Sequence, residues 1–118
     1  MSFDDLMLEL KKDYLSSMPG KFEVIANALK TSDVAQLREE FHKLKGTGKT
    51  YGIPEISDLC AVVEQLCVKR SSYAVGDAQI ALQILSEIHQ TRIGEKEFAL
   101  SGDTRFIEIQ KHLQSASS

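Results

Sequence analysis

The 118-residue sequence has few of the features that mark several protein classes. It has no tryptophan, two cysteines and two prolines, and no apolar run approaches the roughly 18 residues needed to span a bilayer. Positive charge is not in excess, since the formal net charge is −3, which disfavours a dedicated nucleic-acid-binding protein. The first residues are acidic where a secretory signal would be basic. We therefore expect a cytoplasmic protein that binds neither membrane nor nucleic acid.

The two cysteines, Cys60 and Cys67, are seven residues apart. On one helix they would share a face, about 10 Å apart in rise, which is too far for a disulfide. Two reduced thiols that face the core suit a cytosolic protein. The three histidines, His42, His89 and His112, lie at no metal-ligand spacing, so we expect no metal site. His89 and His112 are expected at the surface.

The scarcity of proline and glycine leaves long stretches in which apolar residues follow the helical period, and none of them alternates as a strand would. The fold class predicted is therefore all-α. We expect a short first helix that stops at a Ser-Ser-Met-Pro-Gly turn over residues 16–20. The further helices are expected over about residues 22–30, 34–51 and 54–70, and from 74 or 77 to 93, with a short one after Asp103 and a frayed end over 114–118.

Short connections make consecutive helices antiparallel neighbours. The sequence thus predicts an up-down-up-down four-helix bundle with a short N-terminal helix and room for an extra C-terminal helix. We assign residues 1–93 to the bundle domain and residues 94–118 to a C-terminal extension.

Residues 41–52 carry most of the functional information. Gly46-Thr47-Gly48-Lys49-Thr50 resembles the end of a phosphate-binding P-loop, G-x-x-x-x-G-K-[ST]. The first glycine of that motif would fall at position 43, which is a lysine, and a P-loop follows a buried strand where this segment follows a helical pattern. Nucleotide binding is therefore not the favoured interpretation.

On a helix, the same segment places a histidine among basic residues. Arg38, His42, Lys45 and Lys49 form one stripe that borders the apolar face, and Gly46 lies one turn beyond His42. A glycine inside a helix costs about 1 kcal/mol relative to alanine, so its presence beside the imidazole calls for an explanation. Gly46 leaves room for a bulky partner to reach the ring, and the basic residues would complement a dianionic group on it.

The motif H-x-L-K-G-x-x-x-x-x-G begins at His42 and ends at Gly52. Together with Leu59-Cys60 and with Glu64, 22 residues after the histidine, it resembles the histidine-containing phosphotransfer domains of bacterial and eukaryotic phosphorelays. The resemblance covers about residues 3–92.

The resemblance implies that His42 accepts a phosphoryl group from a receiver-domain aspartyl phosphate and passes it to another receiver aspartate. The protein would be a carrier without independent catalytic activity. Glu64 would accept a hydrogen bond from Nδ1–H of the ring. Lys45 and Lys49 would neutralise the phosphoryl oxygens, and Gly46 would give clearance for docking.

The resemblance also implies the partners, which are response-regulator receiver domains and a sensor or hybrid histidine kinase. Arg38 and Lys43 are candidates for partner contacts. No cofactor is expected on this chain, because Mg²⁺ would be held by the receiver, and a monomer fits the small size. Two alternatives stay open. The chain could be the phospho-accepting module of a larger chemotaxis-type or hybrid histidine kinase, or a helical scaffold that binds a receiver without carrying phosphate.

Overall fold

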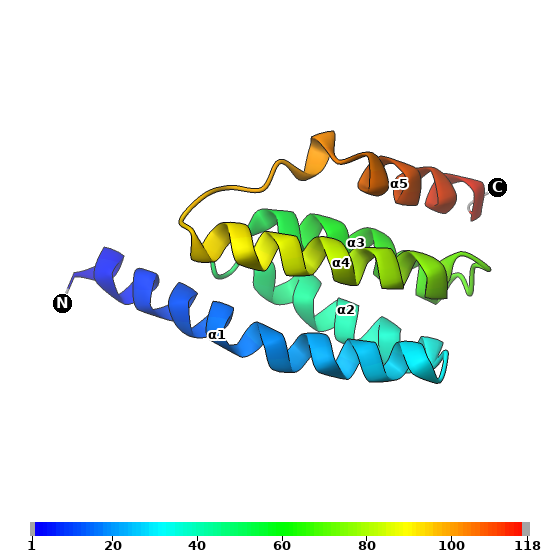
Figure 1. The fold of residues 1–118 in the computed structure, drawn as a ribbon, viewed down its shortest axis with the longest axis horizontal. Coiled ribbons are helices and arrows are strands. Elements are labelled where there is room, and N and C mark those ends of the chain that lie inside the picture. Colours follow the sequence, from blue (N-terminus) through cyan, green and yellow to red (C-terminus); the bar gives the residue numbers. More distant parts are fainter. Residues whose placement is uncertain (1, 117–118) are drawn as a thin grey trace.

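The computed structural model describes residues 2–116, and these contain helices and no strand (Figure 1). The all-α fold class predicted from the sequence is confirmed. The elements in chain order are α1 (Phe3–Lys30), α2 (Val34–Gly48), α3 (Pro54–Val68), α4 (Ala74–Ile93), the 3-10 turn η1 (Leu100–Gly102) and α5 (Thr104–Ala116).

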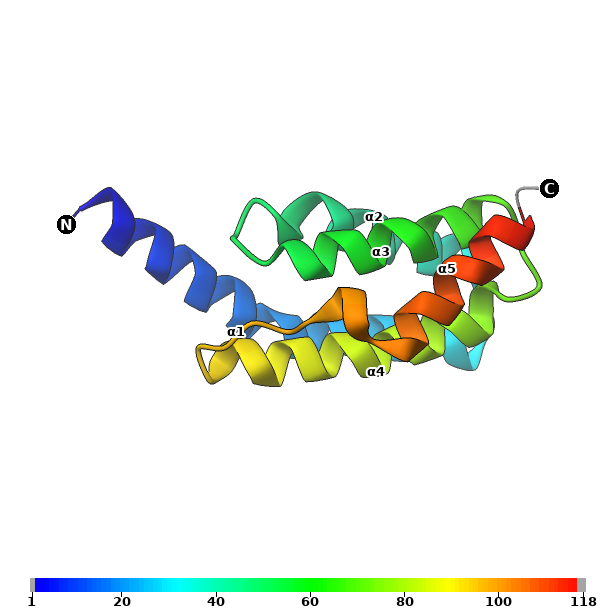
Figure 2. The ribbon, with the colours of Figure 1, turned by 90° about the horizontal axis from the view of Figure 1, so that it is seen from above.

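The first four helices form an antiparallel bundle, and α5 lies along its outside. The closest pairing is between α2 and α3, while α1 packs against α2 and α4, and α5 packs against α3 and α4. The N-terminal part of α1 projects past the end of the other helices, as both views show (Figures 1 and 2). The described residues therefore form an elongated body of 50 × 28 × 19 Å.

The first helix is one continuous element of 28 residues, so the predicted turn over residues 16–20 and the predicted short N-terminal helix are wrong. Pro19 lies inside α1, where it has no amide to donate to the carbonyl of Leu15. His89 of α4 takes over this role, with Nε2 at 2.9 Å from that carbonyl oxygen. His89 is consequently buried, which corrects its expected surface position.

The second helix ends at Gly48, three residues earlier than predicted, and the first turn of α3 holds that end. The hydroxyl of Ser57 donates to the carbonyl of Lys45 at 2.8 Å and accepts from the amide of Lys49 at 2.7 Å. A side chain at position 48 would collide with this contact, because its Cβ would lie 2.6 Å from Ser57 Oγ. Gly52 then turns the chain with φ of +79°, a conformation that favours glycine.

Four helix starts agree with the sequence-based predictions. Asp33 caps α2 by accepting a hydrogen bond from the amide of Gln36 at 3.0 Å. Pro54 occupies the first turn of α3, α4 begins at Ala74, and Asp103 accepts from the first amides of α5. Side-chain caps thus define the starts of α2 and α5, and a first-turn proline defines that of α3, whereas α4 begins without a side-chain cap.

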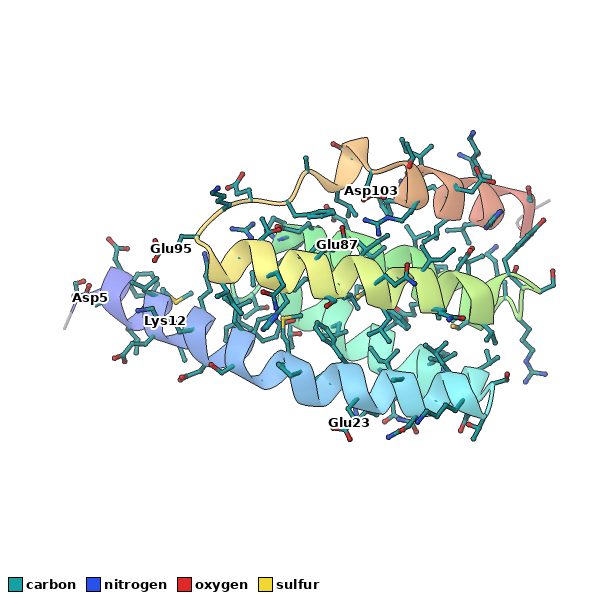
Figure 3. The ribbon with its side chains drawn as sticks, in the orientation of Figure 1. Asp5, Lys12, Glu23, Glu87, Glu95 and Asp103 are labelled. Carbon is teal, nitrogen blue, oxygen red and sulfur yellow. The ribbon has the colours of Figure 1, made fainter. Side chains whose placement is uncertain are left out.

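The C-terminal extension is part of the packed structure. Phe106 and Ile109 of α5 are buried in the hydrophobic core. Arg105 forms ion pairs with Glu87 of α4 at 2.6 Å and with Asp103 at 2.7 Å, and Figure 3 shows these two carboxylates between the helices. The tail that was predicted to fray from residue 114 continues the helix to residue 116, and residues 117–118 lie outside the described residues.

A second polar contact joins the C-terminal half of α5 to α4. His112 Nδ1 lies 2.7 Å from the buried carboxylate of Asp77, and its ring stacks on Tyr73 with centroids 3.9 Å apart. Burial raises the pKa of Asp77, and the histidine beside it only partly opposes this. His112 is therefore half-buried and held, where the sequence suggested a surface residue.

Both cysteines are free and face the core, as predicted. Burial raises the pKa of Cys67 to about 11, with a smaller contribution from the charge of Glu64, and it raises the pKa of Cys60 still further. Both side chains are thiols at neutral pH and behave as small apolar residues. Across residues 2–116, none of the helices combines the length and the hydropathy that crossing a membrane requires.

Candidate functional site

The site centres on His42, which lies in the middle of α2 and exposes 65% of its side chain. Its Nδ1 lies 2.9 Å from Oε1 of Glu64, a residue of α3 that is almost fully buried. The two residues face each other because α2 and α3 run antiparallel and are fixed at one end by the hydrogen bonds of Ser57 to Lys45 and Lys49. Within the described part of the chain, no residue hydrogen-bonds to Nε2 of His42.

The carboxylate of Glu64 has two basic neighbours. Its Oε2 forms an ion pair with Lys45 Nζ at 2.6 Å, while Oε1 holds the ring of His42. Burial raises the pKa of Glu64, but the Lys45 ammonium and the His42 ring outweigh this, so the pKa lies below its usual range. Glu64 is therefore ionised at neutral pH and acts only as an acceptor.

The ionised carboxylate determines which nitrogen of the neutral ring carries the proton. Because Glu64 can only accept, the hydrogen of a neutral His42 lies on Nδ1. The lone pair is then on Nε2, the nitrogen without a described partner. A neutral imidazole with an accessible lone pair is a good nucleophile near pH 7.

The surface next to the ring is open at Gly46. This glycine is exposed, and a Cβ built on it would meet no atom within 4 Å beyond its own helical neighbourhood. Internal packing therefore does not require glycine here, in contrast to Gly48 two residues later. The open position lies one turn after His42, where a side chain would stand beside the imidazole.

The other basic residues predicted from the sequence lie further from the ring. Lys49 is exposed, two turns beyond His42, with Nζ at 3.6 Å from Asp58. Lys43 pairs with Glu40 at 3.3 Å and with Glu39. Arg38 is exposed one turn before His42. Of the predicted residues, the structure thus places His42 and Lys45 in direct contact with Glu64.

The sequence-based predictions did not include the residues that support the half of α2 that follows His42. Ser57 binds the last turn of the helix, and the hydroxyl of Tyr14 on α1 lies 2.9 Å from Oγ1 of Thr47. The ring of Tyr14 also stacks on Tyr51, with centroids 4.7 Å apart. One signal of this in the sequence is the position of Ser57 in the first turn after Pro54. The described residues contain no group of three or more His, Cys, Asp or Glu side chains that could hold a metal ion.

The fold and the site together define a helical bundle that presents one exposed histidine, oriented by a buried carboxylate. A family model of the Hpt domain matches residues 9–94, and the chain therefore belongs to the Hpt domain family. This confirms the resemblance inferred from residues 42–52. A search of the curated proteins and a search of the solved structures each gave no match.

Domains of this family are phosphocarrier modules and not catalysts, and they interact with receiver domains and histidine kinases. The chain is accordingly a phosphotransfer module of two-component signalling. The family match ends at residue 94, before α5 begins, so the last helix lies outside the matched region.

Proposed function

We propose that the protein is a phosphorelay intermediate whose His42 accepts a phosphoryl group from the aspartyl phosphate of one receiver domain and passes it to the aspartate of another. The observation that carries this proposal is the exposed ring of His42 with its Nδ1 held by the ionised Glu64 at 2.9 Å. This arrangement leaves Nε2 as an oriented nucleophile on the surface. The protein acts as a monomeric carrier in the cytoplasm, where its two free thiols stay reduced.

The transfer step needs little from this chain beyond position and charge. The lone pair of Nε2 forms a bond to phosphorus while the acyl phosphate P–O bond breaks, and the aspartate of the receiver leaves as a carboxylate. The proton on Nδ1 stays in place, so the phosphorylated ring is cationic and is stabilised by Glu64. Phosphoryl transfer passes through a loose transition state, for which positioning and electrostatics supply most of the catalysis. Mg²⁺ comes with the receiver, and this chain needs no cofactor.

Three further residues contribute to the proposed phosphoryl transfer. Lys45 contacts Glu64 in the unphosphorylated protein and neutralises the phosphoryl oxygens once they are present. Lys49 adds positive charge from two turns away, and its weak pairing with Asp58 leaves it free to move. Gly46 gives the receiver room to approach the ring. Arg38 and Lys43 are assigned to partner contacts and have no part in the chemistry.

The experiment is label transfer. The protein is mixed with radiolabelled phosphorylated receiver domains and Mg²⁺, beside a His42→Gln control whose fold is checked by circular dichroism. We expect rapid labelling of the wild type that is stable in alkali and labile in acid, and no labelling of the control. Full labelling of His42→Gln would overturn the assignment of the site. Labelling by a kinase alone would favour the kinase-module alternative. Receiver binding without labelling would favour the scaffold.

A further inference from the structure

The N-terminal part of α1 forms a helical arm at one end of the bundle. We call residues 3–12 the arm, and its first turns lie beyond the ends of the neighbouring helices (Figures 1 and 2). The helix begins at a complete capping box, in which Ser2 Oγ accepts from the amide of Asp5 at 3.1 Å and the Asp5 carboxylate accepts from the amide of Ser2. Local chemistry therefore specifies the helix up to its first turn.

A hollow of about 790 Å³ lies where the arm joins the bundle, between α1 and the C-terminal end of α4. Its apolar surface comes from Leu8 and Leu15 of α1 and from Ile93 of α4. Leu8 is 50% exposed and Ile93 is 55% exposed, so this apolar surface is open to solvent. Exposed apolar surface that two helices contribute to one hollow marks an interaction site.

Positive charge surrounds this hollow. Lys11, Lys12 and Arg92 line it, and Glu95 is the one acidic residue that lines it. Arg92 is already bound by Glu55 through two nitrogens, whereas Lys11 and Lys12 form no ion pair within residues 2–116. In Figure 3, Lys12 and Glu95 lie near the bundle, and Asp5 lies near the free end of α1. The hollow therefore suits an apolar side chain that is flanked by carboxylates.

The arm itself carries that combination, in an order that is its own complement. Asp4 and Asp5 stand four and three positions before Leu8, while Lys11 and Lys12 stand three and four positions after it. All five lie on one side of the helix, within about 60° of Leu8. An antiparallel copy of the same segment that crosses at Leu8 places Asp4 beside Lys11, and Asp5 beside Lys12, of the second copy.

Other arrangements fit the arm less well. Helices that lie on a membrane surface carry Lys and Arg on their polar face, because they bind anionic lipids. Residues 3–9 contain three carboxylates, those of Asp4, Asp5 and Glu9, and no basic residue. A parallel pair of arms would bring acid to acid and base to base, which costs free energy. Charge complementarity thus favours a second, antiparallel copy of this chain.

We propose that two copies of the chain form a reversible, twofold-symmetric dimer in which the arm of each copy lies in the hollow of the other. Leu8 of each copy packs against Leu8 and Ile93 of the other, and the acidic residues of each arm pair with the two lysines of the other. Such a contact uses the same surface on both copies and closes on itself. The monomer of the proposed function is then the form at low concentration. The hollow includes no residue of α2 or α3, so both copies of His42 stay exposed.

The first test is the mass of the full chain in solution. Sedimentation equilibrium is measured from about 5 µM to about 500 µM protein at low salt, which spans the affinity expected of a small interface. The apparent mass should rise from 13.1 kDa towards twice that value. The dimer should weaken at high salt, where exposed charges are screened. A constant mass of 13.1 kDa would overturn the proposal and leave the hollow to an acidic helix of a different protein.

Two leucines of the arm give a matched pair of variants. Leu8 and Leu6 are similarly exposed, at 50% and 45%, but they lie on opposite sides of α1, about 160° apart. Leu8→Asp should raise the Kd of the dimer at least about tenfold, and Leu6→Asp should change it less than about twofold. Circular dichroism checks that both arms stay helical. Equal losses in the two variants, or a larger loss in Leu6→Asp, would overturn the proposal.

Charge exchange tests the antiparallel register. The variants are Asp4→Lys and Lys11→Glu, which leave the capping box of Ser2 and Asp5 in place. Each variant alone puts like charges opposite each other and should dimerise at least about fivefold more weakly at low salt. An equimolar mixture restores opposite charges at both positions and should regain the wild-type Kd within about twofold. A mixture that associates no more tightly than the separate variants would refute the register.

The dimer and the phosphotransfer chemistry can fail separately, because none of these measurements uses a phosphoryl donor. Labelling of His42 by a receiver domain, in a protein that stays monomeric, overturns the dimer and keeps the proposed function. A dimer that responds to the variants as expected, in a protein whose His42 is never labelled, keeps the dimer and overturns the proposed function.

Discussion

His89 donates a hydrogen bond from Nε2 to the carbonyl oxygen of Leu15 at 2.9 Å, and this bond joins α4 to α1. Leu15 is the residue whose carbonyl Pro19 leaves without an amide partner. A side chain 74 positions away thus completes the hydrogen bonding of the first helix. The bond also explains why α1 continues through a proline for a further three turns.

Replacing His89 tests this relationship. His89→Leu should lower the free energy of unfolding by about 1–3 kcal/mol, because a buried carbonyl loses its donor. In a Pro19→Ala background the same change should cost less, since the amide of residue 19 then serves Leu15. Urea unfolding of the four proteins gives the coupling energy of the double-mutant cycle. Additive effects of the two substitutions would show that the proline and the histidine do not compensate each other.

The charge of Glu64 predicts a pH-dependent contribution to stability. Its pKa is lowered in the folded protein, so the ionised form stabilises the fold above the unfolded pKa of about 4.3. This contribution is lost as the pH falls through the lowered pKa. Glu64→Gln should cost about 1–3 kcal/mol at pH 7, and the difference from wild type should fade in more acidic solution.

Chemical unfolding of both proteins between pH 7 and pH 3 measures this difference, with the exposed Asp58→Asn as the control. A constant difference across that range would mean that the ionised carboxylate contributes nothing through its charge. The same Glu64→Gln protein should be labelled more slowly, because the cationic phosphorylated ring loses its counter-charge.

Two glycines on one helix form a matched pair. Gly46 is open, so Gly46→Ala should raise stability by up to about 1 kcal/mol, through helix propensity alone. Gly46→Gln should keep the helicity but slow transfer from receivers strongly. Gly48→Ala should instead destabilise by about 1–3 kcal/mol, because its Cβ would lie 2.6 Å from Ser57 Oγ. Receiver transfer at the wild-type rate in Gly46→Gln would refute the clearance argument.

The last helix is predicted to unfold together with the bundle. Phe106→Ala removes a buried ring from α5 and should lower the free energy of unfolding by about 3 kcal/mol. Its neighbour Ile107 is 39% exposed, so Ile107→Ala should change stability by less than about 0.5 kcal/mol. Urea titration followed by helical circular dichroism should show one transition for each protein. A separate early transition in the wild type would mean that α5 is an independent appendage.

The sequence predicted the helices whose ends are determined locally. Asp33, Pro54 and Asp103 lie at helix starts where local chemistry favours them, and the helix predicted over residues 54–70 corresponds to α3. The motif of the family was equally clear in the sequence, because its histidine, lysine and first glycine lie within five residues of one helix. Such features depend on neighbours in the chain, which a single sequence displays.

The errors came from interactions between distant residues. Pro19 and Gly20 are strong local signals for a turn, and only the contact with His89 overrides them. The positions of His112 and Glu64 likewise depend on how helices pack, since their partners lie 35 and 22 residues away. The resemblance to a known family predicted the pair of His42 and Glu64. It did not predict the pair of His112 and Asp77, because His112 lies beyond residue 94, where the family match ends.

The two oxygens of Glu64 are both engaged, one by the ring of His42 and the other by Lys45. The lowered pKa of Glu64 makes it a weak base toward water, although it is the carboxylate in contact with the ring. In a domain that carries phosphate on an exposed histidine, the lifetime of the phosphorylated form limits how long a signal can be stored. If His42 carries the phosphoryl group as proposed, a buried and weakly basic Glu64 would not speed its hydrolysis, and the group would stay in place until a receiver arrives, without a lid to exclude solvent.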